Sequence, residues 1–326
     1  MRQPPPHPWI RTLLDEERAA PSARSLSLAQ LRARAVARYT NPALARAPME
    51  SVETTRLPGS SGAIGIRVYR PTGPVAGTLV FLHGGGFTVG DLDSHEVLCR
   101  ALAAASGLVT VAVDYRLAPE HPFPAGLDDC AQAYAFVADS GAFDGPVALA
   151  GDSAGGALAC GVVQRRIAAG RPLPAALALI YPVTDHCSRP KPSYEAFGAE
   201  FGFTTALMEW FWDLYLPEPG LADHPEVSPL QYPGLARFPP TRIVTAGYDL
   251  LCDEGRMLAG RMLVAGVEAE LVHYPDMNHG FMMWQGLLAP ADEAVRACGD
   301  WLAWRVAAAD AAEEPMPLRR PLTRPR

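Results

Sequence analysis

The 326-residue sequence lacks the features of several large protein classes. It has no run of about 18 uninterrupted apolar residues, the length that a membrane-spanning helix needs. Residues 1–18 contain no apolar core of about seven residues and carry acidic residues early, so they do not predict a secretory signal. The net charge of −7 gives no excess of positive charge for binding nucleic acid or an anionic membrane.

The six cysteines form no C-x-x-C pair and no His/Cys cluster at the spacing of a zinc site. Most lie in apolar surroundings, where buried free thiols are common. This pattern favours a reducing compartment, and we expect a cytoplasmic protein with no metal and no organic cofactor. The cysteines are Cys99, Cys130, Cys160, Cys187, Cys252 and Cys298.

Strand-like and helical segments alternate along most of the chain. Residues 1–50 have apolar side chains at helical spacing, and 52–70 predict an antiparallel strand pair around a Gly-Ser-Ser-Gly turn. Continuous apolar runs, typical of strands buried on both faces, then alternate with helical stretches such as 94–106 and 154–169. We expect an α/β fold with a mostly parallel sheet flanked by helices. The predicted strands are 78–82, 108–115, 147–151, 177–182, 242–247 and 269–275.

One connection is much longer than its neighbours. About sixty residues, rich in aromatics and then in proline, separate the fourth and fifth predicted strands. We interpret this connection as an insertion that forms a helical cap together with the N-terminal helices. The predicted organisation is N-terminal cap helices 1–50, an α/β core in two parts, 51–187 and 239–308, a cap insertion 188–238, and a disordered tail 309–326.

A candidate nucleophile lies in the stretch VALAGDSAGG. It places G-x-S-x-G, residues 151–155, between a predicted strand and a predicted helix. A sharp turn with small flanking residues exposes the hydroxyl of its central serine, here Ser153. The alternative is a glycine-rich turn capped by Asp152 or Ser153, but the position of the motif favours the nucleophile.

Three consecutive glycines occur in HGGGF, residues 83–87. Backbone N–H groups without side chains can approach and stabilise the oxyanion that forms in acyl transfer. We expect Gly85, Gly86 and Ala154, the residue after the nucleophile, to supply these donors. A phosphate cradle is the weaker alternative, because it needs G-x-x-x-x-G-K-[ST] or a G-x-G-x-x-G that begins a helix. The residues that support these motifs are His83, Gly84 and Asp152.

A serine nucleophile needs a general base, and four histidines follow Ser153 in the sequence. His279 lies in a loop just past the last predicted strand, where Gly280 allows a tight turn. This loop belongs to the carboxyl edge of the sheet, so we predict His279 as the base. The other three histidines are His186, His224 and His273. We expect a structural position for His273 and solvated positions for His186 and His224.

The base needs an orienting carboxylate, and three acidic residues follow the predicted strand 242–247. Asp249 comes immediately after the strand, at the same sheet edge as the serine and the histidine. Asp253 and Glu254 come a turn later and have the character of helix-start residues. We therefore predict Asp249, which gives the chain order Ser–Asp–His of an α/β-hydrolase triad.

Taken in order, HGGGF, DYRLAPEHPFPA, GDSAGG, DLLCDEG and NHGF resemble the motifs of the hormone-sensitive-lipase-like esterases, bacterial family IV. The resemblance covers roughly residues 50–305. It implies the α/β-hydrolase fold, the triad of Ser153, Asp249 and His279, the same oxyanion hole and a helical cap. We interpret the stretch DYRLAPEHPFPA as part of the structural scaffold and not as a source of catalytic residues. One departure is Leu250, because the family usually has proline after the triad aspartate.

The leading hypothesis is a serine carboxylesterase that hydrolyses small-molecule esters through an acyl-enzyme. An amidase or deacetylase with the same triad stays open, as does a small-molecule receptor, since the plant gibberellin receptor resembles this family and has lost the base. Aromatic side chains near the predicted site suggest a pocket for short- to medium-chain esters. The predicted pocket residues are Phe87, Phe203, Trp210 and Phe211. The sequence leaves open the natural substrate and the oligomeric state, a homodimer included.

Overall fold

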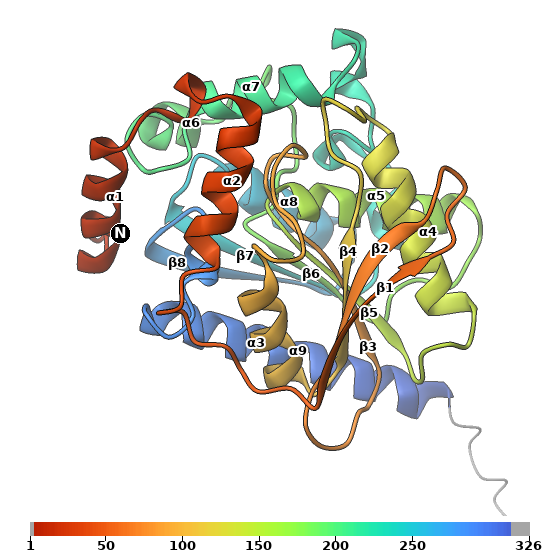
Figure 1. Cartoon of the computed structure of the whole chain (residues 1–326). Helices are drawn as coiled ribbons and strands as arrows, with labels where there is room; N and C mark the ends of the chain where they lie inside the picture. The colour runs from red at the N-terminus through yellow and green to blue at the C-terminus, as the bar shows by residue number, and fades with distance from the viewer. Residues whose placement is uncertain (1–2, 314–326) are drawn as a thin grey trace, which may run out of the picture.

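The computed structural model describes residues 3–313 and contains one eight-stranded sheet between two layers of helices (Figure 1). The strand order is β1-β2-β4-β3-β5-β6-β7-β8. The first three strands in this order pair antiparallel and the others pair parallel. The strands are β1 Ser51–Leu57, β2 Ile64–Arg70, β3 Thr78–Leu82, β4 Val109–Asp114, β5 Val147–Asp152, β6 Leu177–Ile180, β7 Thr241–Tyr248 and β8 Ala269–Asn278.

Helices cover both faces of the sheet and also its upper end in Figure 1. Helices α3 and α9 pack against one face, and α4, α5 and α8 pack against the other. Helices α2, α6 and α7 lie at the upper end, and α1 lies at the left of the view. The helices are α1 Pro8–Ala19, α2 Leu28–Tyr39, α3 Glu96–Ser106, α4 Ala125–Asp139, α5 Ala154–Ala168, α6 Pro192–Phe197, α7 Thr205–Tyr215, α8 Cys252–Val264 and α9 Ala289–Glu313.

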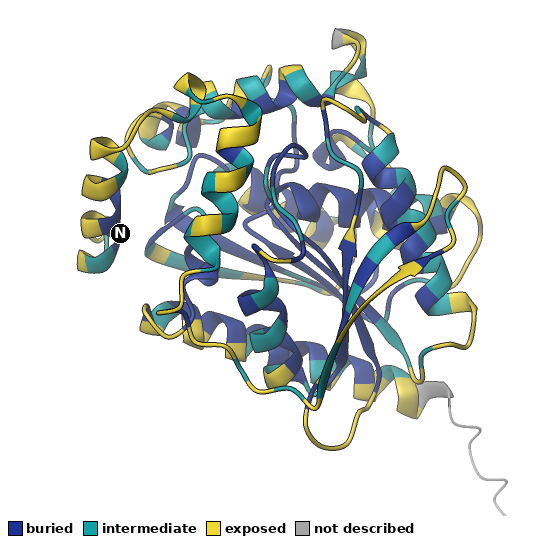
Figure 2. Cartoon of the chain, viewed as in Figure 1, coloured by how far each residue is buried: buried dark blue, intermediate teal, exposed yellow. Residues whose placement is uncertain are grey.

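The sheet separates two apolar cores, which appear as the dark blue interior of Figure 2. All five residues of β3 are buried, because its side chains face a helical layer on either side. The continuous apolar runs of the sequence therefore predicted the central strands correctly, and all six runs form strands β3 to β8. The predicted antiparallel pair at the N-terminal side is also confirmed as β1 and β2.

Two sequence expectations about the chain ends need correction. Residues 40–50 connect α2 to β1 without a helix, in a stretch that contains Pro42 and Pro48. Helix α9 continues to Glu313, so residues 309–313 are helical and not a disordered tail; this stretch is rich in alanine, the best helix former. The rest of the predicted tail lies outside the described residues. Within residues 3–313, none of the helices combines the length and hydropathy that crossing a bilayer requires.

Candidate active site

Ser153 occupies a strained turn between a strand and a helix. Strand β5 ends at Asp152 and α5 begins at Ala154, and Ser153 between them has φ 53° and ψ −120°. A positive φ is uncommon for a residue with a side chain and indicates a conformation that its surroundings impose. A Cβ atom at Gly155 would overlap the carbonyl oxygen of Leu82, so the turn needs glycine there. Because Ser153 makes no side-chain capping bond to α5, the capping alternative has no support.

The side chains of Ser153, His279 and Asp249 form one continuous hydrogen-bonded array. His279 Nε2 lies 3.0 Å from Ser153 Oγ, and His279 Nδ1 lies 2.8 Å from Asp249 Oδ2. A carboxylate only accepts hydrogen bonds, so Nδ1 is the donor to Asp249 and Nε2 is left to accept from the serine hydroxyl. Gly280 follows with φ 79°, a left-handed conformation that turns the chain away after the histidine.

The first two acidic residues after β7 occupy different environments. Asp249 is 2% exposed, and its Oδ1 accepts the N–H of Leu251 at 2.9 Å while Oδ2 faces the histidine. Asp253 lies one turn into α8, where Oδ2 accepts the N–H of Ser193 at 3.0 Å. The structure thus brings Asp249, and not Asp253, to the histidine. Leu250, at the family's proline position, donates no backbone hydrogen bond within the described residues, so the missing N–H of a proline would cost nothing there.

The glycine loop after β3 presents free backbone donors beside Ser153. Gly85 and Gly86 have φ values of 113° and 58°, and a Cβ atom at Gly86 would overlap the ring of Phe211. Among the described residues, neither glycine N–H donates to a protein group. Ala154 is the first residue of α5, so its N–H has no partner inside the helix. Gly85 and Gly86 line the same cavity as Ser153.

Buried polar groups hold this loop in place. Gly84 donates its N–H to Asp152 Oδ1 at 2.7 Å. Burial works against the ionised Asp152, but the charge and hydrogen bond of His95 and the Gly84 N–H outweigh it and lower the pKa of Asp152. Burial and the neighbouring His95 lower the pKa of His83 to about 4, so its ring is neutral at pH 7. The His83 ring stacks on Tyr115 at 4.2 Å, which makes it a support of the loop and not a base.

A cavity of about 200 Å³ opens beside the array. Of the predicted pocket residues, Phe203 and Phe211 line this cavity, and Phe203 stacks on the His279 ring at 4.7 Å. Phe87 and Trp210 do not line it. Phe87 is 3% exposed and stacks on Tyr215 at 3.9 Å, so it fastens the glycine loop to α7. Trp210 stacks on the ring of Phe211, with the two centroids 6.1 Å apart, and lies outside the lining.

The other histidines are held by local contacts. His186 is half-buried and packs against the ring of Trp212 at 4.9 Å, so the expectation that it is solvated is wrong. Burial and the charge of a neighbouring arginine lower the pKa of His186. His224 is exposed, as expected. His273 lies in β8 with Nδ1 3.0 Å from Thr245 Oγ1, which agrees with a structural position.

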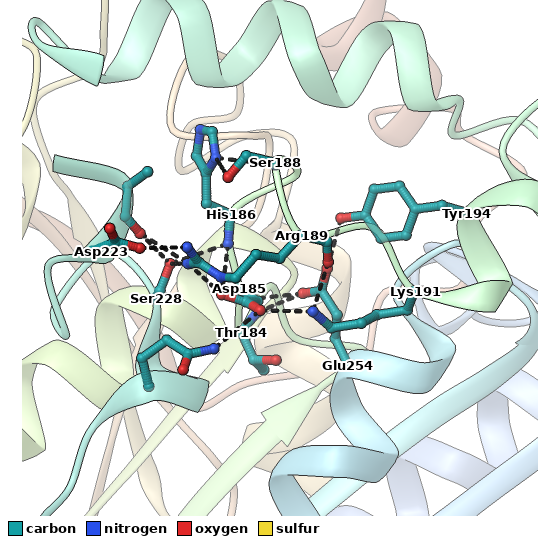
Figure 3. Close-up of polar contacts among 12 residues, drawn as sticks. Thr184, Asp185, His186, Ser188, Arg189, Lys191, Tyr194, Asp223, Ser228 and Glu254 are labelled. Carbon is teal, nitrogen blue, oxygen red and sulfur yellow. Dashed lines mark hydrogen bonds and ion pairs between the residues drawn. The ribbon is translucent and has the colours of Figure 1, made fainter. Parts of the chain in front are cut away.

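Sequence analysis missed a buried carboxylate beside the candidate site (Figure 3). Glu254 lies in the first turn of α8 as expected, yet it is 0% exposed. Its Oε2 accepts the N–H groups of Thr184 and Asp185 at 2.9 and 3.1 Å. Tyr194 of α6 donates its hydroxyl to Oε1 at 2.6 Å. Burial raises the pKa of Glu254 to about 7, although these three hydrogen bonds favour the ionised form.

Asp185, next to Glu254 in Figure 3, ties the two ends of the 188–238 segment together. It is 0% exposed and accepts hydrogen bonds from Arg189 at 2.6 Å and Lys191 at 2.7 Å. Arg189 also donates a hydrogen bond to Asp223, in the second half of the segment, at 2.5 Å. The sequence signal that could have revealed this network is the pairing of Asp185 with basic residues four and six positions later.

Comparisons with known proteins identify the fold and the family. The family model of the alpha/beta hydrolase fold matches residues 79–283. The carboxylic ester hydrolase LipN of Mycobacterium tuberculosis is 39% identical over 249 residues, which are 72% of this chain and 66% of that relative. The ethyl acetate hydrolase of Pseudomonas putida is 36% identical over 240 residues, 71% of this chain and 75% of that relative.

Solved structures are similar over nearly the whole chain. An ester hydrolase from the metagenome of Lake Arreo, complexed with a derivative of bipyridine phosphonate, has a TM-score of 0.88 and 36% identity. The match covers 93% of this chain and 99% of that chain. An esterase of Pyrobaculum calidifontis has a TM-score of 0.84 and 34% identity, and the match covers 94% of this chain and 100% of that chain. The chain therefore belongs to the hormone-sensitive-lipase-like family of carboxylic ester hydrolases, which have the α/β-hydrolase fold.

Proposed function

We propose that this chain is a serine carboxylesterase in which Ser153, His279 and Asp249 act as the catalytic triad. The observation that carries the proposal is the array in which His279 Nε2 lies 3.0 Å from the serine oxygen and Nδ1 lies 2.8 Å from the carboxylate. Ser153 Oγ attacks the ester carbonyl carbon while His279 takes the hydroxyl proton. Asp249 keeps the ring in the required tautomer and stabilises the imidazolium that forms.

The negative charge of the tetrahedral intermediate develops on the former carbonyl oxygen. The N–H groups of Gly85, Gly86 and Ala154 are the donors we assign to this oxygen, because none of them donates to a protein acceptor within residues 3–313. The protonated His279 then gives its proton to the leaving alcohol, which leaves an acyl group on Ser153. Water attacks this acyl-enzyme with the same base and the same donors, and the carboxylic acid leaves.

The size of the cavity supports short- to medium-chain esters as substrates. Its volume of about 200 Å³ is bounded by Phe203, Leu207 and Phe211 of the insertion and by Leu31 of α2. Each buried methylene contributes about 0.8 kcal/mol, so affinity rises with chain length until these walls are reached. We assign residues 1–50 and 188–238 to a cap that closes the cavity.

The cellular setting is part of the same proposal. All six cysteines lie within the described residues, and each is a free thiol. Free thiols persist in reducing compartments, which supports a cytoplasmic location. A homodimer stays a prediction that size-exclusion chromatography with light scattering would test.

Turnover of nitrophenyl esters by three variants tests the triad. We expect Ser153→Ala and His279→Ala each to lower kcat by a factor on the order of 10⁶, because triad members act as a unit. Asp253→Asn, a carboxylate variant outside the array, serves as the control and keeps most of the activity. A chain-length series of the same esters tests the pocket, with an optimum at short to medium acyl chains. Substantial turnover in Ser153→Ala would contradict the mechanism, and efficiency that rises out to long chains would contradict the closed pocket.

A further inference from the structure

We propose that the preferred esters carry a negative charge remote from the scissile bond, and that Arg34 of α2 binds this charge. The inference rests on the proposed function and names its substrate class. Its first basis is the distribution of charge along the chain. Residues 1–50 contain eight arginines and four acidic residues, a net charge of +4, whereas the whole chain carries −7. The segment that reaches the cavity is thus basic on an otherwise acidic protein.

The second basis is the position of Arg34 between two cavities. The cavity beside Ser153 adjoins an outer cavity of about 900 Å³ that is walled by α1, α2 and the insertion. Arg34 itself lines the cavity beside Ser153, so the distal end of an ester bound there can reach it. The residues that line both cavities, which we call the passage, are Glu17, Arg34, Arg38, Gly202 and Leu207.

The charges in this passage do not cancel. Arg38 forms an ion pair with Glu17, and its guanidinium lies 4.9 Å from the centre of the Trp284 ring. Arg34 donates one hydrogen bond, from Nη1 to the carbonyl oxygen of Pro21 at 2.7 Å. Within residues 3–313, no Asp or Glu oxygen lies within 4.0 Å of the Arg34 guanidinium. One positive charge is therefore left without a carboxylate partner in the passage.

The chemistry of this group selects an anion. A guanidinium has five N–H donors in a planar fork that matches the two oxygens of a carboxylate, and Arg34 uses one of them on Pro21. Arg34 is half-buried beside the apolar side chains of Leu31 and Leu207, where a charge pair is screened less than at the surface. A carboxylate at the distal end of the substrate gains this interaction, a neutral end does not, and a quaternary ammonium is repelled.

Matched phenyl esters test the preference on the acyl side. Monophenyl adipate, phenyl hexanoate and phenyl 6-(trimethylammonio)hexanoate differ mainly in the charge at the distal end, and the adipate carboxylate is too far from the ester to attack it efficiently. On the alcohol side, 4-acetoxybenzoate is compared with 4-acetoxybenzamide. For at least one side we expect kcat/KM to favour the anionic ester about tenfold over the neutral one, mainly through KM. The preference shrinks in about 0.5 M NaCl, because salt screens the charge.

Variants connect the preference to the passage. Arg34→Gln lowers the anionic-to-neutral ratio of kcat/KM to near one, and Arg34→Lys keeps most of it. Glu17→Gln frees the charge of Arg38 and raises the ratio. Arg11→Gln is the matched control: Arg11 is exposed, lines neither cavity and also donates to one backbone carbonyl, that of Pro6 at 3.2 Å. This control leaves the ratio unchanged.

The outcomes separate the inference from the function on which it rests. An equal or lower kcat/KM for both anionic esters, with phenyl hexanoate still hydrolysed, overturns the role of Arg34 and leaves the esterase standing. The role of Arg34 is also overturned if Arg34→Gln and Arg11→Gln lower the anionic-to-neutral ratio of kcat/KM to the same extent. The effect would then depend on net charge alone. Failure of the wild-type protein to hydrolyse any of the neutral esters would instead contradict the proposed function.

Discussion

The insertion of residues 188–238 and the N-terminal segment of residues 1–50 both border the cavity, but they are attached to the core in different ways. The insertion is tied by Asp185, which is 0% exposed and bound to Arg189 and Lys191. The N-terminal segment packs Ile10, Leu13 and Leu14 into an apolar core, and its ion pair to the core joins Arg32 and Glu120, whose side chains are 30% and 53% exposed. Removing one partner of a buried ion pair costs several kcal/mol, whereas an exposed pair contributes about 0–1 kcal/mol.

This difference shows which kind of contact holds each wall of the cavity. The insertion also places Trp212 and Tyr215 in the main apolar core, so a change in its position would disturb the glycine loop through Phe87. The N-terminal segment contributes mainly polar and charged groups to the passage between the two cavities. The insertion thus gives the cavity an aromatic wall, and the N-terminal segment gives the passage its charges.

The largest effect we expect is the difference in kcat between a variant of the triad carboxylate and a variant of a carboxylate that holds the insertion. Asp249→Asn lowers kcat by a factor of about 10⁴, because the asparagine favours the wrong imidazole tautomer. Asp253→Asn costs far less activity and mainly lowers stability, since Asp253 accepts the N–H of Ser193 in the insertion. Steady-state kinetics and urea unfolding of both variants measure the two effects. A larger loss of kcat in Asp253→Asn would show that the carboxylate is wrongly assigned.

The second prediction compares the two attachments directly. Asp185→Asn lowers the free energy of unfolding by about 3–5 kcal/mol, because it leaves Arg189 and Lys191 without their buried counter-charge. Glu120→Gln, which removes only the exposed ion pair and leaves the backbone contacts of Arg32 in place, lowers it by about 0–1 kcal/mol. Urea denaturation at neutral pH provides both values. Similar losses in the two variants would mean that the segments are attached equally firmly and would break the comparison.

A smaller effect concerns the pH dependence of the buried attachment. The pKa of Glu254 is raised to about 7 in the folded protein from its ordinary value of 4.5. The folded protein therefore holds this proton more tightly than the unfolded chain, and the resulting stabilisation is complete below pH 4.5. Raising the pH through 7 removes it, a loss of about 3 kcal/mol.

Urea unfolding of the wild type and of Glu254→Gln between pH 4.5 and 8 measures this contribution. The glutamine does not titrate, so the variant loses less stability than the wild type across this range. Tyr194→Phe serves as a control, because it removes one hydrogen bond to Glu254 and leaves the carboxyl in place. Parallel pH profiles for the wild type and Glu254→Gln would contradict the raised pKa.

Sequence reasoning succeeded where local pattern and burial coincide. Strand β3 was predicted with its observed bounds because both of its faces are buried, so each of its five positions is apolar. The turn at Ser153 was predicted because small residues at fixed spacing are needed on both sides of it. The same reasoning brought Ser153, Asp249 and His279 to one edge of the sheet, as the structure has them.

What sequence reasoning missed depends on contacts between distant segments. Helix α7 has aromatic residues on several of its faces, so the sequence could not tell that Phe211 faces the cavity while Trp210 lies outside it. Tyr194 and Glu254 are sixty positions apart, and no local pattern marks their hydrogen bond. The expectation for Phe87 failed because its neighbours in sequence suggested the cavity, whereas its stacking partner is Tyr215.

The central claim is that Ser153 is a nucleophile activated by His279, and covalent labelling with a fluorophosphonate tests it most directly. Peptide mapping by mass spectrometry after labelling identifies the modified residue without the need for a natural substrate. We predict one label per chain on Ser153 in the wild type, much slower labelling of His279→Ala, and none of Ser153→Ala. A label on another residue, or an unlabelled wild-type protein that still hydrolyses esters, would contradict the account.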